Sequence, residues 1–375
     1  MKDDSVSHKQ NDAIQGLRGI AALLVVITHS ILTLIERAHY SPADAQLAYR
    51  LGELGVKMFF VISGFIMTVT MYKSFARPGA PMTFVWRRLV RIVPVYWLVT
   101  LLYAIKLTLT GNPPQLSELF LSLFFIPYDH RQAMFGAPLY ALGWTLNYEM
   151  FFYMLFTLAL LLPRKFGLSF LLALLVALVG INHIGGFHSC PGALCATQVV
   201  YTQPIILYFA GGICLAITRK WLEVRHRGAF VSTNSAIAVS LVVAVVYGTV
   251  VSVGLAPQES DASAIAQVLA CGIATTVCTL EYSSAHRSGR IRGLFLALGN
   301  ASYSIYLTHS FLMGPAGRVL SLITPTAEGP AFAGIFVLLM LTGASLLGML
   351  SYRFVERPTL DFLRTRLAPR HAAIA

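Results

Sequence analysis

The chain has 375 residues, of which 56% are hydrophobic and only 12% are charged, and its formal net charge is +12. A soluble domain carries about twice this charged fraction, so the composition excludes a water-soluble globule and predicts a polytopic membrane protein. Helical spans of about 20 residues joined by short loops use nearly all of the length. We therefore expect one all-α membrane domain over residues 1–375, with short tails at 1–13 and 365–375 and no separate soluble domain.

Ten apolar stretches are long enough to cross a bilayer as helices. A shorter run between two prolines, Leu116–Ile126, is expected to be an interfacial or re-entrant piece. In chain order the ten predicted spans are Leu17–Ile35, Gly55–Tyr72, Val90–Thr110, Gly143–Leu162, Phe166–Ile184, Val199–Ile217, Ser235–Leu255, Ala262–Leu280, Ser302–Ile323 and Ala331–Arg353.

The basic residues distribute unequally between the two sides that these spans define. Of the 28 Lys and Arg, 22 fall on the side of the N-terminus and six fall on or near the other side. Because cytoplasmic loops collect Lys and Arg, both termini are predicted to be cytoplasmic. Topology thus accounts for most of the net charge, and no nucleic-acid partner is expected.

The first span carries two ionisable residues on one face. Arg18 and His29 are eleven residues apart, which is about three helical turns and about 16 Å along the axis. Ionisable side chains inside a bilayer are costly and often mark functional sites. The spacing suits a long anionic ligand with its charge near Arg18 and its reactive end near His29. Alternatively, Arg18 anchors the span at the interface and His29 bonds a neighbouring helix.

Two further features suggest contacts with such a ligand. Arg87, Arg88 and Arg91 lie three and four residues apart at the start of the third span, so their guanidinium groups face one direction. Such a cluster can clamp phosphate, although arginines also flank spans for topology alone. In the second span, Ser63 and Gly64 permit the close approach of either a ligand chain or a neighbouring helix.

The fourth and ninth spans supply the other candidate site residues. Glu149 lies about two turns below the outer end of its span, at a depth similar to that of His29. We expect the Glu149 carboxylate to hold the His29 ring in the orientation of a general base, with a purely structural pair as the alternative. Tyr303, Tyr306 and His309 are expected to face the same cavity as substrate contacts or oxyanion donors. No metal site is expected.

Five blocks, taken together and in order, resemble the acyltransferase-3 family of membrane acyltransferases. They cover nearly the whole chain at spacings similar to those of the family. Within it, the stretches IQGLRGIAALLVVITH and GWTLNYEMFFY most resemble succinoglycan-type exopolysaccharide O-acetyltransferases. The five blocks are the Arg18 to His29 spacing, Gly55–Phe65, Arg87–Trp97, Trp144–Tyr153 and Ser302–His309.

The resemblance implies an enzyme of the bacterial inner (plasma) membrane, surrounded by membrane lipid. It would move an acetyl or other acyl group from acyl-CoA, with acetyl-CoA as the expected co-substrate, to a hydroxyl of an exopolysaccharide, another surface glycan or a lipid-linked oligosaccharide precursor. The family's catalytic role falls on His29, and its donor contacts fall on Arg18, Arg88 and Arg91.

The residue pattern and the resemblance together predict a mechanism. The pantetheine arm of the donor would pass Ser63 and Gly64. His29, oriented by Glu149, would then take the proton of the sugar hydroxyl. A transient acetyl-histidine is the alternative chemistry.

One position departs from the family, because Lys57 stands where an acidic residue is usual. Glu53 and Glu36 are the candidates to replace the missing charge; otherwise Lys57 marks an altered acceptor or an inactive member. From the residues alone, two other classes stay open. One is a transporter or flippase that uses the buried His and Glu for protons or solute, and the other is a structural membrane subunit.

Overall fold

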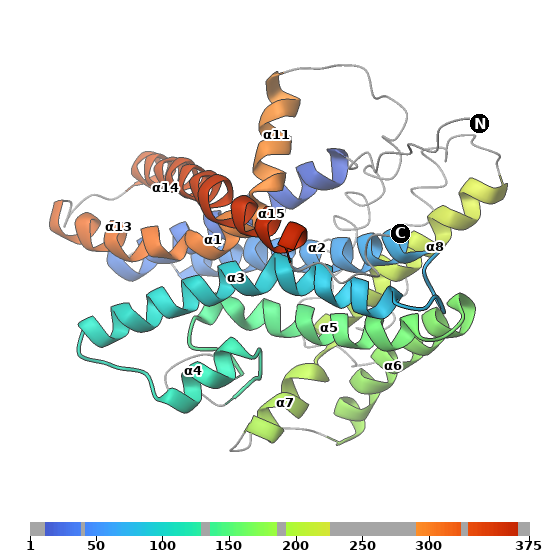
Figure 1. Ribbon diagram of the computed structural model, residues 1–375. Helices are drawn as coiled ribbons and strands as arrows, with labels where there is room; N and C mark the ends of the chain where they lie inside the picture. The colour runs from blue at the N-terminus through green and yellow to red at the C-terminus, as the bar shows by residue number, and fades with distance from the viewer. Residues whose placement is uncertain are drawn as a thin grey trace.

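The computed structural model describes residues 12–38, 42–128, 136–185, 193–225, 290–323 and 329–366 (Figure 1). Within these ranges the chain is helical and has no β-strand, as the all-α prediction requires. The elements are α1 (Asp12–Ala38), α2 (Pro42–Met71), α3 (Ala80–Leu109), α4 (Leu116–Leu123), η1 (Ala141–Gly143), α5 (Trp144–Leu160), α6 (Arg164–Gly185), α7 (Ala193–Tyr201), η2 (Pro204–Ile206), α8 (Leu207–Arg225), α11 (Arg290–Asn300), α12 (Ser302–Thr308), α13 (Ser310–Ile323), α14 (Pro330–Ser351), the π-helix η4 (Tyr352–Glu356) and α15 (Arg357–Arg366).

Several described helices are long and apolar enough to cross a membrane. Two bent pieces, Leu194–Tyr201 and Pro204–Trp221, meet at 54° and make one more candidate if they form a single span. The predicted spans Ser235–Leu255 and Ala262–Leu280 lie outside the described residues, so the count of ten and the cytoplasmic termini stay predictions. The five straight candidates are Ile14–Glu36, Leu51–Met71, Ala80–Leu109, Arg164–Gly185 and Ala331–Thr365.

Helix α5 is three residues shorter than the predicted fourth span Gly143–Leu162, and the segment before it is packed inside the protein. It has 17 residues, which corresponds to about 25 Å, less than the thickness of a bilayer core of about 30 Å. Most of the residues that precede it are buried, with Leu139 7% and Tyr140 2% exposed. The start of α5 is therefore packed against other parts of the protein.

The predicted ninth span is divided into two helices, α12 and α13, which meet at His309. The hydroxyl of Tyr140, from the buried segment before α5, donates a hydrogen bond to the carbonyl of Leu307 and lies 2.6 Å from the hydroxyl of Ser310. This side chain therefore satisfies a backbone acceptor at the break, as discontinuities at membrane depth require. The short run predicted around Leu116 is the eight-residue helix α4.

Helix α1 lies between two groups of helices. On one side it packs on α2, which in turn packs on α8; on the other it packs on α11, α12, α13 and α14. Helices α3 and α5 run side by side (Figure 1) and share the larger apolar core with α2, α6 and α8. A smaller core joins α1 to α11, α12, α13 and α14. Phe59 contacts both cores, so the two groups meet at this side chain.

Two glycines allow α2 and α8 to cross closely. A Cβ atom at Gly64 would lie 2.2 Å from the carbonyl oxygen of Phe209, and one at Gly212 would lie 2.1 Å from that of Val61. Small residues permit such backbone contact between membrane helices. Beside the crossing, the rings of Phe60 and Phe209 stack with centroids 4.5 Å apart. The structure therefore gives Gly64 the role of a packing residue.

We expect Gly212→Ala to lower the midpoint of thermal unfolding of the purified protein in detergent. The added methyl group is accommodated only if α2 and α8 separate, and such overpacking costs about 1–3 kcal/mol. The matched control is Gly211→Ala, because a Cβ atom there meets nothing within 4 Å and alanine favours a helix. Equal midpoints for the two variants would contradict the close crossing.

Candidate active site

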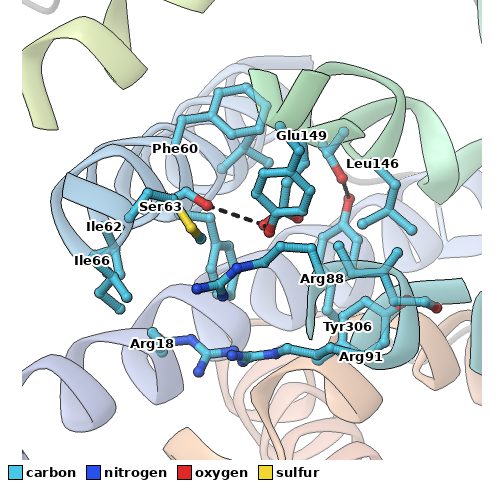
Figure 2. A pocket seen from close by; sticks show the side chains of 17 residues that line it. Arg18, Phe60, Ile62, Ser63, Ile66, Arg88, Arg91, Leu146, Glu149 and Tyr306 are labelled. Atoms are coloured by element: carbon cyan, nitrogen blue, oxygen red, sulfur yellow. Dashed lines mark hydrogen bonds between the residues drawn. The ribbon is translucent and has the colours of Figure 1, made fainter. Parts of the chain in front are cut away.

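A pocket lies between α1, α2, α3, α5 and α12 (Figure 2). It encloses about 750 Å³ of space between atoms, its open part included. The apolar part of its wall comes mainly from α2. The polar and charged residues that line it are Arg18, Ser63, Arg88, Arg91, Thr145, Glu149, Tyr153, Tyr303 and Tyr306.

Three guanidinium groups from two helices meet in this pocket. Arg88 and Arg91 are three residues apart on α3 and so share one face, while Arg18 extends toward Arg91 from α1 (Figure 2). Arg18 is only 9% exposed, and its Nη1 donates to the side-chain oxygen of Gln15 at 3.2 Å. The Nε of Arg88 is buried and has no hydrogen-bond partner among the described residues. Arg18, Arg88 and Arg91 thus meet in one pocket, with donor capacity left for an anion, whereas Arg87, which was expected to face the same way, is exposed and does not line the pocket.

Among the described residues that line the pocket, Glu149 alone supplies a carboxylate. It accepts hydrogen bonds from the hydroxyl of Ser63, at 3.0 Å, and from the hydroxyl of Tyr153 (Figure 2). The wall thus holds three arginines against one carboxylate. Its charge remains positive, which suits an anionic ligand.

The expected contact between Glu149 and His29 is not formed. Gly52 of α2 lies against Thr28, next to His29, whereas the partner of Glu149, Ser63, is eleven residues farther along α2, or about 16 Å. Glu149 therefore lies at the depth of the arginines. The prediction was wrong because it began the fourth span at a membrane surface, while the true start of α5 is buried.

His29 contacts His309 instead. The two ring centroids are 4.9 Å apart and the rings are inclined at 64°. Each ring is fixed by its own helix, since Nδ1 of His29 lies 2.9 Å from the carbonyl oxygen of Val25 and Nδ1 of His309 lies 2.7 Å from that of Tyr306. The structure thus contains a histidine pair, His29 and His309, apart from the arginine pocket.

Tyr306 and Phe59 lie between the pocket and the histidine pair. Both line the pocket, and their ring centroids are 6.0 Å apart; the Tyr306 ring is in turn 6.2 Å from that of His309. The histidine pair therefore lies next to the pocket, separated from it by these two side chains.

The two tyrosine hydroxyls predicted as oxyanion donors already have acceptors. Tyr303 donates to the carbonyl of Ile92 at 2.7 Å, and Tyr306 donates to the carbonyl of Leu142 at 3.0 Å. A hydroxyl has one proton to donate. In this arrangement Tyr303 and Tyr306 therefore shape the pocket wall and fix α12.

Two other predicted residues lie outside the pocket wall. Gly64 belongs to the crossing of α2 and α8, as described above. Lys57 is buried, and its Nζ forms an ion pair with Glu53 at 3.0 Å and lies 5.8 Å from the ring centroid of Tyr208. Glu53 therefore compensates the charge of Lys57, one turn away on the same face.

Sequence reasoning missed Glu356. It is 3% exposed and accepts a hydrogen bond from Ser304 at 2.6 Å, and its carboxylate is near enough to Arg18 and Arg91 to attract them. Because Arg353 and Arg357 flank Glu356, the sequence predicts a basic segment here, on the side of the N-terminus. The signal available in the sequence was a lone acidic residue at the end of an apolar span.

Comparisons with known proteins agree with this architecture. Residues 11–349 match the acyltransferase-3 family model, described as an acyltransferase domain. The exopolysaccharide production protein ExoZ of Rhizobium meliloti (strain 1021) is 34% identical over 322 residues, which cover 85% of this chain and 92% of ExoZ. BcsY of Komagataeibacter xylinus, whose name assigns it to the membrane-bound transacylases, is 27% identical over 96% of this chain and 86% of its own.

No solved structure matches the chain. The family match spans most of the sequence and includes each helix that contributes to the pocket and the histidine pair. The chain therefore belongs to the acyltransferase-3 family and is an acyltransferase of the membrane.

Proposed function

We propose that the protein transfers an acetyl or related acyl group from acyl-CoA to a hydroxyl of an exopolysaccharide or of its lipid-linked precursor, in the bacterial inner membrane. The observation that carries the proposal is the pocket of three arginines with a histidine pair beside it. The acceptor class is supported by the similarity to ExoZ, a protein named for exopolysaccharide production.

The pocket suits the phosphate end of the donor. Arg18, Arg88 and Arg91 face one another from two helices, and guanidinium groups bind phosphate through paired hydrogen bonds. CoA carries its phosphates and its thioester at opposite ends of a long arm. With the phosphates at the arginines, the arm runs past Ser63 and Phe59 toward His29, about 16 Å from Arg18 along α1.

His29 is proposed as the general base. The backbone carbonyl of Val25 can only accept a hydrogen bond, so the proton of the neutral ring lies on Nδ1 and the lone pair on Nε2. Nε2 takes the proton of the acceptor hydroxyl as its oxygen attacks the thioester carbonyl. The carbon–sulfur bond then breaks, and the thiolate recovers that proton from His29. Attack on the thioester by Nε2 itself, through an acyl-histidine, gives the same net reaction.

Glu149 is proposed to hold the donor pocket together. Its bond with Ser63 joins α2 to α5, its bond with Tyr153 fixes the carboxylate within α5, and its negative charge offsets part of the arginine cluster. Its contribution to catalysis is thus through the position of the donor and not through the His29 ring.

We expect His29→Ala to abolish acyl transfer, because the only proposed proton acceptor at the thioester is lost and general-base catalysis contributes about 10²–10⁴-fold. The measurement uses purified protein, labelled acetyl-CoA and the exopolysaccharide as acceptor. The midpoint of thermal unfolding in detergent checks that the variant is folded. Full activity of the variant would contradict this role. Solute uptake into proteoliposomes without acyl transfer by the wild type would instead indicate a transporter.

We expect Arg88→Gln to raise the KM for acetyl-CoA about tenfold or more with a smaller change in kcat, because a buried charged contact to phosphate is lost. The matched control is Arg87→Gln, which removes the same charge from the adjacent residue of α3. Arg87 is exposed and does not line the pocket, so its variant should keep the KM of the wild type. A similar rise in both variants would indicate general surface attraction and not a built donor site.

A further inference from the structure

His309 has an unusual buried nitrogen. The residue is 0% exposed, and its Nε2 has no hydrogen-bond partner among the described residues. Buried polar atoms are almost always paired, and one that is not is explained by strain, by a bound water or ion, or by a catalytic role. The pocket wall does not include His309, so a donor bound in the pocket does not explain the unpaired nitrogen.

Hydrogen bonds determine which nitrogen of His309 carries the proton. Nδ1 faces two backbone carbonyl oxygens, of Tyr306 at 2.7 Å and of Ile305 at 3.2 Å. Carbonyl oxygens only accept, so Nδ1 is the protonated nitrogen and Nε2 carries a lone pair. The bonds of Tyr140 to Leu307 and Ser310 fix the backbone on both sides of this residue.

His29 is in the same state, with its proton directed to Val25 and its lone pair on Nε2. Two neutral rings with free lone pairs therefore lie edge to face, 4.9 Å apart between centroids. While both rings are neutral, neither Nε2 has a proton to donate to the lone pair of the other. The interaction between the two rings becomes favourable when one ring gains a proton, because the lone pair of the other ring then stabilises the positive charge.

We propose that His309 is a positioning residue for His29, with its unpaired Nε2 stabilising the imidazolium that forms when His29 takes the proton of the acceptor hydroxyl. This inference rests on the proposed function, in which His29 is the base. The O–H bond of the acceptor breaks and an N–H bond forms on His29. His309 stays neutral throughout, and the proton leaves with the thiol.

Two amide substitutions of His309 separate this role from simple packing. The side chain of His309→Asn reaches the position of Nδ1 and can still donate to the carbonyl of Tyr306, but it has no acceptor at the position of Nε2. The longer side chain of His309→Gln places an amide oxygen near the position of Nε2. The packing control is Thr308→Val, since Thr308 is also buried and its hydroxyl, within the described part of the chain, bonds only the carbonyl of Ser304 in its own helix.

The experiment measures acyl transfer from acetyl-CoA to the exopolysaccharide, with kcat and donor KM determined separately, and the midpoint of thermal unfolding for each variant. We expect His309→Asn to lower kcat between about tenfold and about a hundredfold, the effect of one lost interaction with a charged group. Its donor KM should stay within about twofold of the wild type. His309→Gln should recover most of kcat, and Thr308→Val should match the wild type.

Three results would overturn the inference while leaving the proposed function intact. They are wild-type kcat in His309→Asn, equal losses in the Asn and Gln variants together with lowered unfolding midpoints, and a change confined to the donor KM. If the wild type transfers no acyl group, the proposed function fails and this role of His309 fails with it.

Discussion

The need to compensate positive charge inside an apolar protein governs this structure. Arg18, Arg88 and Arg91 are held among helices whose other surfaces face a membrane, where an uncompensated charge is costly. Glu149 lines the same pocket and Glu356 lies nearby, and each is bonded to a serine of another helix. These bonds tie α2 to α5 and α12 to the end of α14. The helices that carry the arginines and those that carry the carboxylates must therefore assemble together, and the pocket is a product of that assembly.

Features that depend on helical periodicity could be predicted from the sequence. Arg88 and Arg91 face one pocket because a spacing of three residues brings side chains to one side of a helix, whereas Arg18 reaches the same pocket through the packing of α1. The depth of Glu149 could not be predicted in this way. It depends on the buried segment around Tyr140, which moves the start of α5 inward, and no local pattern records such a tertiary contact. The pairing of His29 with His309 has the same origin, since it requires the break between α12 and α13.

Glu356 illustrates a second limit of sequence reasoning. A π-helix adds a residue to the turn, so it rotates the following side chains away from the face that α-helical spacing predicts. In η4 this turn carries Glu356 inward to Ser304 while the neighbouring Arg357 stays exposed.

For Gly64 the sequence allowed either a ligand or a helix as the neighbour. Only the position of Phe209 on α8 decides between them.

The crossing of α2 and α8 also has a mechanical consequence. Because Gly64 and Gly212 each touch the backbone of the opposite helix, neither helix can slide along the other, and the wall of the pocket that α2 provides keeps a fixed register. Any widening that admits a ligand must come from another wall. Helix α3 is suited to such bending, because Pro94 removes a backbone hydrogen bond only three residues beyond Arg91. The wall that α2 provides thus holds Ser63 in place, and any bending of α3 at Pro94 would change the positions of Arg88 and Arg91 relative to it.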